Sequence, residues 1–452
     1  MKIRRFSDFQ TRISFPNLDD SISKYYECFK SSDLGKIYEA IPWDSLVQSL
    51  NLKKKTKGPS SIFSPRGKLA LMFLKNYCGC SDRKLIEQFN GNIYYQIFCD
   101  TFLEPGELLS NYKIVSQIRC ELAPLLNIDK WEKNLMESWR DYMENLESIT
   151  FDATCYESSI RYPTDVKLLY ESVSWIYSQI KNICKSNKLR MPRTKIKNWI
   201  PRYISYSKMR RKTKKKRRSI TRGLLRLLTK LTKELERLEE TYNSPLARKQ
   251  YWQRRCAINT ILQQQSDKFY KGERPKNAIV SIDKSYIRPI VRGKEIKQVE
   301  FGAKVHKLQI DGISFIEHLS FDAFNEGTRL IKTMYKAQAL TRTRVKLVGA
   351  DAIYATNKNR NYLTSKSVQT DFKPKGRKGK HSKHKAQISK MITKERASRL
   401  EGSFGTDKEY FLLNRIKART QQTEKLWIFI GIHCSNALNI GRRMANIKSE
   451  AA

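Results

Sequence analysis

Hydrophobic positions at helical spacing dominate the first third of the chain. Within residues 64–92, apolar side chains recur on one helical face up to Gly79, where a first helix is expected to end. Ser81 has the chemistry of an N-cap for a second helix, which Asn90 and Gly91 are expected to end. We therefore predict that residues 1–146 form a helical N-terminal domain.

The two helices around Gly79 allow two interpretations. Helices joined by a short glycine-containing turn are typical of a helix-turn-helix DNA reader, but an ordinary helical hairpin in a core has the same pattern. Both stay open. The DNA-reading interpretation needs outward basic side chains, for which the candidates are Arg66, Lys68, Arg83 and Lys84.

A leucine repeat organises the middle of the chain. Five leucines with 4-3-4-3 spacing predict one apolar helix face: Leu224, Leu228, Leu231, Leu235 and Leu238. Two heptads are too few for a free-standing coiled coil, so a helical hairpin inside a larger domain is favoured over a dimer contact. Residues 167–272 are accordingly expected to be a basic helical insertion.

Strand signals lie on both sides of this helical stretch. An apolar run over 148–152 ends on Asp152, and β-prone runs follow at 277–283, 300–310 and 312–321. Asp311 and Gly312 between the last two runs predict a hairpin turn. Further along we expect a helix over 328–340, a strand over 344–351, a helix over 357–365, a strand within 367–374 and an apolar helix over 426–440.

Without the insertion, the order of elements is strand, hairpin, helix, strand, helix, strand and final helices. This order predicts an α/β catalytic domain over residues 147–166 and 273–445. Nine scattered cysteines without a CxxC pair indicate reduced thiols rather than a zinc site. Neither a signal peptide nor a run of about eighteen apolar residues is recognisable, so a cytoplasmic protein without a membrane partner is expected.

The charge of the chain points to a polyanionic partner. Lysine and arginine number 88 against 44 acidic residues, which gives a net charge of +44. Nucleic acid is the favoured partner, because neutralising phosphates releases counterions. Two basic runs, over 207–219 and 373–385, supply most of the candidate DNA-binding residues: Lys208, Arg210, Arg211, Lys212, Lys214, Lys215, Lys216, Arg217, Arg218, Lys375, Arg377 and Lys378.

Three acidic residues are candidates for metal-dependent phosphoryl chemistry. Asp152 and Asp351 each end an apolar strand, and Glu401 opens a helical segment beyond the last strand. Two Mg²⁺ or Mn²⁺ ions need oxygen ligands of this kind. Each acid also has a plain structural explanation as a turn former or a helix-terminal charge. Asp283 also closes an apolar run and competes with Asp152 at this stage.

Three segments around these acids resemble the DDE transposases of bacterial insertion sequences. They are FDATCYESSIRYPTD (151–165), VGADAIYATNKNR (348–360) and EGSFGTDKEYFLLNRIKART (401–420), and the likeness extends from about Pro65 to Arg443 around the insertion. The resemblance selects Asp152 over Asp283, because R-Y-P-T-D follows only Asp152. It implies an RNase H-like mixed sheet flanked by helices.

The resemblance also implies roles for residues. Asp152, Asp351 and Glu401 would be the catalytic, metal-binding acids, and Lys408 would contact a phosphate near the scissile bond. Related groups carry an arginine four positions before the glutamate, whereas position 397 here is alanine. The nearest arginines are Arg396 and Arg399, and which of them, if any, supports the site is left open.

Three other polar features carry weaker expectations. His306 is expected to be a surface histidine on an alternating strand. His381 and His384 are interpreted as phosphate contacts rather than zinc ligands. Arg161, a further candidate DNA-binding residue, is expected to pair with Asp165 and brace the turn after Asp152.

The implied function is DNA transposition. The protein would bind the terminal inverted repeats of its own element, cut the 3′ ends and join them to target DNA. It would act as a homodimer on double-stranded DNA, associated with the bacterial nucleoid. Two alternatives are an RNase H-like nuclease that does not join DNA and a non-catalytic DNA-binding protein derived from a transposase.

Overall fold

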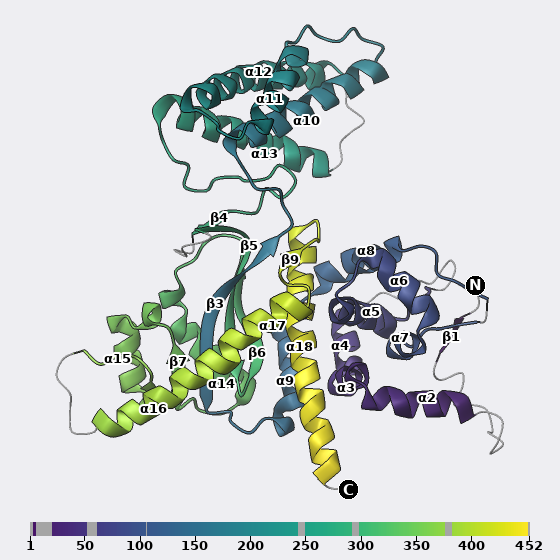
Figure 1. Ribbon diagram of the computed structural model, residues 1–452, viewed down its shortest axis with the longest axis vertical. Helices are drawn as coiled ribbons and strands as arrows, with labels where there is room; N and C mark the ends of the chain where they lie inside the picture. Colours follow the sequence, from purple (N-terminus) through teal and green to yellow (C-terminus); the bar gives the residue numbers. More distant parts are fainter. Residues whose placement is uncertain are drawn as a thin grey trace. The chain divides into compact units, whose positions relative to one another are not determined.

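A computed structural model describes residues 3–5, 20–51, 61–104, 106–242, 249–291, 298–375 and 382–450. The chain divides into two compact units (Figure 1). The first unit comprises residues 1–158, 303–320 and 324–452, and the second comprises residues 159–302 and 321–323. The three domains predicted from the sequence, residues 1–146, 147–166 with 273–445, and 167–272, remain a prediction. Among the described residues, no helix combines the length and apolarity needed to cross a membrane.

The N-terminal part of the first unit is helical, as predicted. A short antiparallel pair, β1 (Ile3–Arg4) with β2 (Phe102–Leu103), accompanies the helices. The helices are α2 (Asp20–Ser31), α3 (Asp33–Ala40), α4 (Trp43–Leu50), α5 (Pro65–Cys78), α6 (Asp82–Gly91), α7 (Ile93–Phe98), α8 (Lys113–Leu122) and α9 (Ile128–Trp139).

The predicted helix limits around Gly79 are confirmed. Gly79 follows α5 with a φ of 64°, and the Ser81 side chain accepts a hydrogen bond from Lys84 N at the start of α6. Helix α5 is buried continuously from Leu69 to Asn76, so it is a core helix. The side chain of Arg66 is not outward, because its guanidinium lies over the Tyr38 ring at 4.8 Å.

The sheet of the first unit is mixed. Its strand order is β6 (Ile313–Ser320), β5 (Val299–Ile310), β3 (Ser148–Ser158), β7 (Leu347–Ala350) and β8 (Gln369–Thr370). Strands β3, β7 and β8 run parallel, whereas β5 and β6 form an antiparallel hairpin. The hairpin turn has positive φ at both Asp311 and Gly312, as the sequence predicts.

Strand β3 is longer than expected. It continues six residues beyond Asp152 to Ser158, because Glu157 and Ser158 pair with β9 (Arg415–Ile416). Asp152 therefore lies within the strand rather than at its tip. The prediction that this strand ends on Asp152 is wrong, since pairing with a segment more than 250 residues away extends it.

Helices complete the first unit after the sheet. A π-helical turn, η6, joins α16 and α17 into one uninterrupted helical stretch, so Glu401 does not begin a helix as expected. The elements are η4 (Glu326–Thr328), α14 (Leu330–Thr341), η5 (Ala352–Tyr354), α15 (Asn357–Ser365), α16 (Ser382–Glu395), η6 (Arg396–Glu401), α17 (Gly402–Tyr410) and α18 (Gln421–Glu450).

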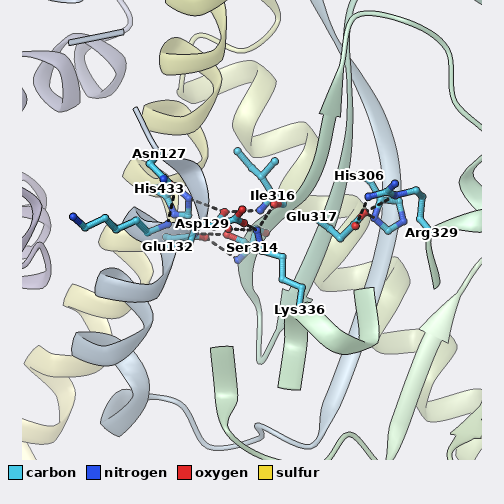
Figure 2. Close-up of polar contacts among 12 residues, drawn as sticks. Asn127, Asp129, Glu132, His306, Ser314, Ile316, Glu317, Arg329, Lys336 and His433 are labelled. Atoms are coloured by element: carbon cyan, nitrogen blue, oxygen red, sulfur yellow. Dashed lines mark hydrogen bonds and ion pairs between the residues drawn. The ribbon is translucent and has the colours of Figure 1, made fainter. Parts of the chain in front are cut away.

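A buried polar cluster ties the N-terminal helices to the sheet (Figure 2). Glu132 of α9 accepts hydrogen bonds from Ile316 N of β6 at 2.6 Å and lies 3.2 Å from His433 Nε2 of α18. Lys336 Nζ of α14 lies 2.6 Å from the other carboxylate oxygen of Glu132. Elements from three distant parts of the sequence therefore share one core.

The second unit contains a bundle of helices, as the leucine repeat predicts. The helices are α10 (Asp165–Ser186), α11 (Ile196–Lys208), α12 (Lys214–Thr241) and α13 (Lys249–Ser266), followed by a π-helical turn, η3 (Asp267–Lys271). All five leucines of the repeat are at most 5% exposed in the bundle core. Burial within the unit supports the helical hairpin over the dimer contact.

One predicted strand of the second unit is absent. Residues 277–283 form no strand, because Ile279 packs into the core beside α10 and α13 and its N–H donates to the Gln264 side chain. A short strand, β4 (Pro289–Val291), pairs instead with residues 299–301 of β5.

Candidate active site

The register of the central strands brings two of the predicted acids together. Strands β3 and β7 are parallel, and Phe151 pairs with Ala350 at the end of their ladder. Asp152 is the next residue of β3, and Asp351 directly follows β7. Because adjacent strands lie about 4.8 Å apart, the two carboxylates project from neighbouring positions.

Asp351 is held at its position by the backbone and by an arginine. Its Oδ1 accepts a hydrogen bond from Ala352 N at 2.7 Å at the start of η5. The Arg396 Nη2 atom lies 3.7 Å from the same oxygen. The Asp351 side chain is 60% exposed, so it remains accessible from solvent.

Arg396, not Arg399, is the arginine that lies beside Asp351, at the carboxyl end of β7. Arg396 Nη1 donates to Ala350 O at 2.7 Å and to Asp371 Oδ2 at 2.9 Å. Arg399 pairs with Asp311 and Glu395 instead. A π-helical turn accommodates one more residue than an α-helical turn, so it brings the residue five positions before Glu401 to this side of the helix.

Asp371 is a further acid at the carboxyl end of β7, beside Ala350 and Arg396, and it was not among the candidates from the sequence. It follows β8, and its Oδ1 accepts a hydrogen bond from Ala350 N at 3.2 Å. Burial raises the pKa of the Asp371 carboxyl, although the hydrogen bond from Ala350 and the charge of Arg396 oppose the rise. A weak signal was present, since Asp371 lies in a predicted strand segment and directly follows β8, although that strand is polar.

Glu401 lies on the helical stretch that packs over β3. Alternate residues of a strand share one face, so Asp152 and Tyr156 point to the same side of β3. The Tyr156 hydroxyl donates to Asp407 Oδ2 of α17 at 2.6 Å, which identifies the covering helix, and η6 also packs against β3. Glu401 is exposed at the junction of η6 and α17, and Lys408 lies two helical turns further on α17.

A buried ion pair fixes the position of α17. Lys307 Nζ of β5 lies 2.7 Å from Asp407 Oδ2 and donates to Ser403 Oγ at 2.9 Å. Burial lowers the pKa of Lys307, and the charge of Asp407 opposes this effect. Sequence reasoning missed this pair, because neither residue stands in a pattern that distinguishes it from a surface charge.

A second polar group lies on β5 and β6. His306 is fully buried, contrary to the expectation of a surface histidine, because Phe151 and Tyr354 pack on its ring. His306 Nδ1 lies 3.2 Å from Glu317 Oε2, and Arg329 Nε donates to the same carboxylate oxygen at 3.0 Å (Figure 2). Burial would raise the pKa of Glu317, but hydrogen bonds from His306 and Arg329 outweigh it and hold that pKa at about 2.

Several predicted contacts lie elsewhere. Asp283 pairs with Arg254 at 2.6 Å in the second unit. The expected pair of Arg161 with Asp165 is wrong, because Asp165 pairs with Lys268 at 2.8 Å while Arg161 is exposed.

The basic candidates fall into three groups. Those of the run 208–218 are all exposed and belong to the second unit. Lys375 donates to Asn357 Oδ1 at 2.7 Å. Arg377, Lys378 and His381, and the side chain of His384, lie outside the described residues.

The donor chemistry at the sheet edge suits a divalent cation. Asp152 and Asp351 supply the hard carboxylate oxygens that Mg²⁺ and Mn²⁺ prefer. Within the described part of the chain, however, no three His, Cys, Asp or Glu side chains converge closely enough to hold a metal ion. Glu401 is therefore present on the covering helix but is not gathered with the two aspartates.

Two family models match the chain. The model described as "Transposase DDE domain" matches residues 348–435, which include Asp351 and Glu401. The model described as "Transposase domain (DUF772)" matches residues 23–119, within the N-terminal helices. A search of the curated proteins and a search of the solved structures each found no match. Asp152 lies outside both matched ranges.

Proposed function

This chain belongs to the DDE transposases, and from that premise we propose that it binds the terminal inverted repeats of its own element, cuts their 3′ ends and joins them to target DNA. The catalytic acids are Asp152, Asp351 and Glu401, on an RNase H-like domain. The adjacent register of Asp152 and Asp351 is the observation that carries this proposal. The mixed sheet with helices on its faces supports the fold assignment.

Both chemical steps are in-line displacements at phosphorus. In cleavage, the oxygen of water forms a new P–O bond as the bond to the 3′ oxygen breaks, and the 3′ oxygen leaves with a proton. In joining, the freed 3′-hydroxyl attacks a target phosphate and another 3′ oxygen leaves. Two divalent ions, Mg²⁺ or Mn²⁺, would activate the attacking oxygen and stabilise the leaving one.

The residues of the chain hold and orient the reacting groups. Asp152 and Asp351 would bind the ions from adjacent strands, and Glu401 would complete the set by turning toward β3. Arg396 holds Asp351 and Asp371 at the sheet edge. Lys408, on the same side of the helix as Glu401, would contact a phosphate beside the scissile bond.

The proposal is tested by a cleavage and joining assay on a DNA end of the element with Mg²⁺. We expect Asp152→Asn, Asp351→Asn and Glu401→Gln each to lower cleavage by roughly 10²-fold or more. Asp283→Asn is the matched control, because this exposed aspartate pairs with Arg254 in the other unit, and its activity should be unchanged. Near wild-type cleavage by any of the three acid variants would overturn its assignment.

The products separate the possible activities. Joined DNA supports a transposase, whereas nicks without joined product would indicate a nuclease. Full biological activity of a variant lacking all three acids would indicate a non-catalytic DNA-binding protein. We further propose that the DNA-bound form is a homodimer at the bacterial nucleoid, which size-exclusion chromatography with and without DNA would test.

A further inference from the structure

Helix α12 carries a continuous row of basic side chains. Six exposed residues are separated by three or four positions, the spacing of one helical face: Lys215, Arg218, Arg222, Arg226, Lys230 and Lys233. At 1.5 Å per residue this α12 basic stripe is about 27 Å long. The buried leucines occupy the other side of the helix, so the core of the bundle fixes which way the stripe faces.

The charges of the stripe are not neutralised within the unit. In the described part of the chain, none of its six members forms an ion pair. Six acidic residues of the same unit are instead paired with other cations: Asp165 with Lys268, Glu234 with Arg237, Glu236 and Glu239 with Arg255, Asp267 with Lys271, and Asp283 with Arg254. An unneutralised row of this length needs an external anion.

A hollow beside the stripe adds hydrogen-bond donors. A cavity of about 480 Å³ is lined by Arg226, Lys230 and Lys233 together with Thr229, Ser266 and Tyr270. Tyr270 is 62% exposed although it lines the hollow. The Thr229 hydroxyl already donates to Leu225 O, so the donors left for phosphate oxygens are the three cations and the hydroxyl groups of Ser266 and Tyr270.

We infer that the α12 basic stripe and its hollow bind the phosphate backbone of duplex DNA. This inference deepens the proposed function by assigning one DNA contact to the helical unit. It also moves the contact away from the first part of the basic run, because Lys208 ends α11 and residues 209–213 only connect α11 to α12. Charge density in the sequence marked that connection, whereas helical geometry selects the stripe.

Two triple variants with the same change in net charge test this inference. The stripe variant is Arg222→Gln, Arg226→Gln and Lys230→Gln, and the control is Arg210→Gln, Arg211→Gln and Lys212→Gln. The affinity for a duplex is measured against NaCl concentration. We expect the stripe variant to lose about tenfold or more in affinity and to lower the salt slope by about 2.7, whereas the control keeps the wild-type slope.

Equal losses in the two variants, or a loss confined to the control, would overturn the inference. Circular dichroism of both variants checks that the helices persist. Duplex binding that follows the stripe, in a protein that neither cuts nor joins DNA, would sustain this inference and contradict the proposed function. The two failures are therefore distinguishable.

Discussion

Lys307 and Asp407 form an ion pair buried on both sides, with Lys307 Nζ 2.7 Å from Asp407 Oδ2. The pair joins β5 to α17, the helix that also carries Lys408. Because Asp407→Ala leaves the lysine buried without its partner, we expect the free energy of unfolding to fall by about 3–5 kcal/mol. Denaturant unfolding of both proteins measures this loss.

The control for this pair is Arg342→Ala, which removes an exposed pair with Glu137. Their side chains are 63% and 45% exposed, so the loss should not exceed about 1 kcal/mol. The double variant Lys307→Met, Asp407→Leu should recover most of the stability, because neither charge is then left buried. An equal, small loss in both single variants would contradict a buried anchor.

Glu317 makes the stability depend on pH. Its folded pKa is about 2, below the ordinary value of 4.5. A carboxyl whose pKa is depressed on folding stabilises the protein above its unfolded pKa, and that contribution disappears as the pH falls from 4.5 toward 2. For the full shift the contribution is roughly 3 kcal/mol.

The measurement is the free energy of unfolding at several pH values, with the wild type compared to Glu317→Gln. We expect the difference between the two proteins to shrink as the pH falls through this window. Glu137→Gln, in an exposed pair, should follow the wild type throughout. A constant difference between wild type and Glu317→Gln would show that this carboxylate is not the group that titrates.

Arg396 should matter more than its neighbour Arg399. Arg396→Ala leaves the buried carboxylate of Asp371 and the carbonyl of Ala350 without this donor, so unfolding should become easier by about 1–3 kcal/mol. DNA cleavage should also fall, because Arg396 reaches Asp351. Arg399→Ala removes a half-exposed side chain, so the free energy of unfolding and the rate of DNA cleavage should both stay near the wild-type values. The reverse order of effects would show that the π-helical turn does not select Arg396.

Gly223 on α12 is required by a close approach of Trp199. A Cβ atom at this position would lie 1.7 Å from the indole ring. Although alanine favours helices more than glycine does, Gly223→Ala should lower the free energy of unfolding by about 1–3 kcal/mol through overpacking. Gly405→Ala on α17 is the control, since no atom lies within 4 Å of its Cβ, and it should be neutral or stabilising. A stabilised Gly223→Ala would contradict the packing of Trp199.

The candidate site could be predicted from the sequence only in part. Asp152 and Asp351 were candidates because each ends an apolar β-prone run, and the family resemblance preferred Asp152 to Asp283. The parallel register puts the two aspartates side by side. Asp371 was missed although it directly follows β8, because that strand is polar. Lys307 gave no recognisable signal, because an isolated lysine looks the same in the sequence whether it is buried or exposed.

Local chemistry determined much of the secondary structure from the sequence by itself. Gly79 and Ser81 limit helices because backbone conformation and capping depend on adjacent residues, and Asp311 with Gly312 makes a turn for the same reason. The leucine repeat specified the buried face of α12 through its spacing alone.

Only the tertiary structure decided which distant residues meet. It extended β3 beyond Asp152 through β9, gave Asp165 to Lys268 instead of Arg161, and brought Arg396 rather than Arg399 to Asp351. Each outcome depends on strand pairing, on helix packing or on one extra residue in a helical turn. Such contacts join residues far apart in the chain, and spacing along the sequence does not encode them.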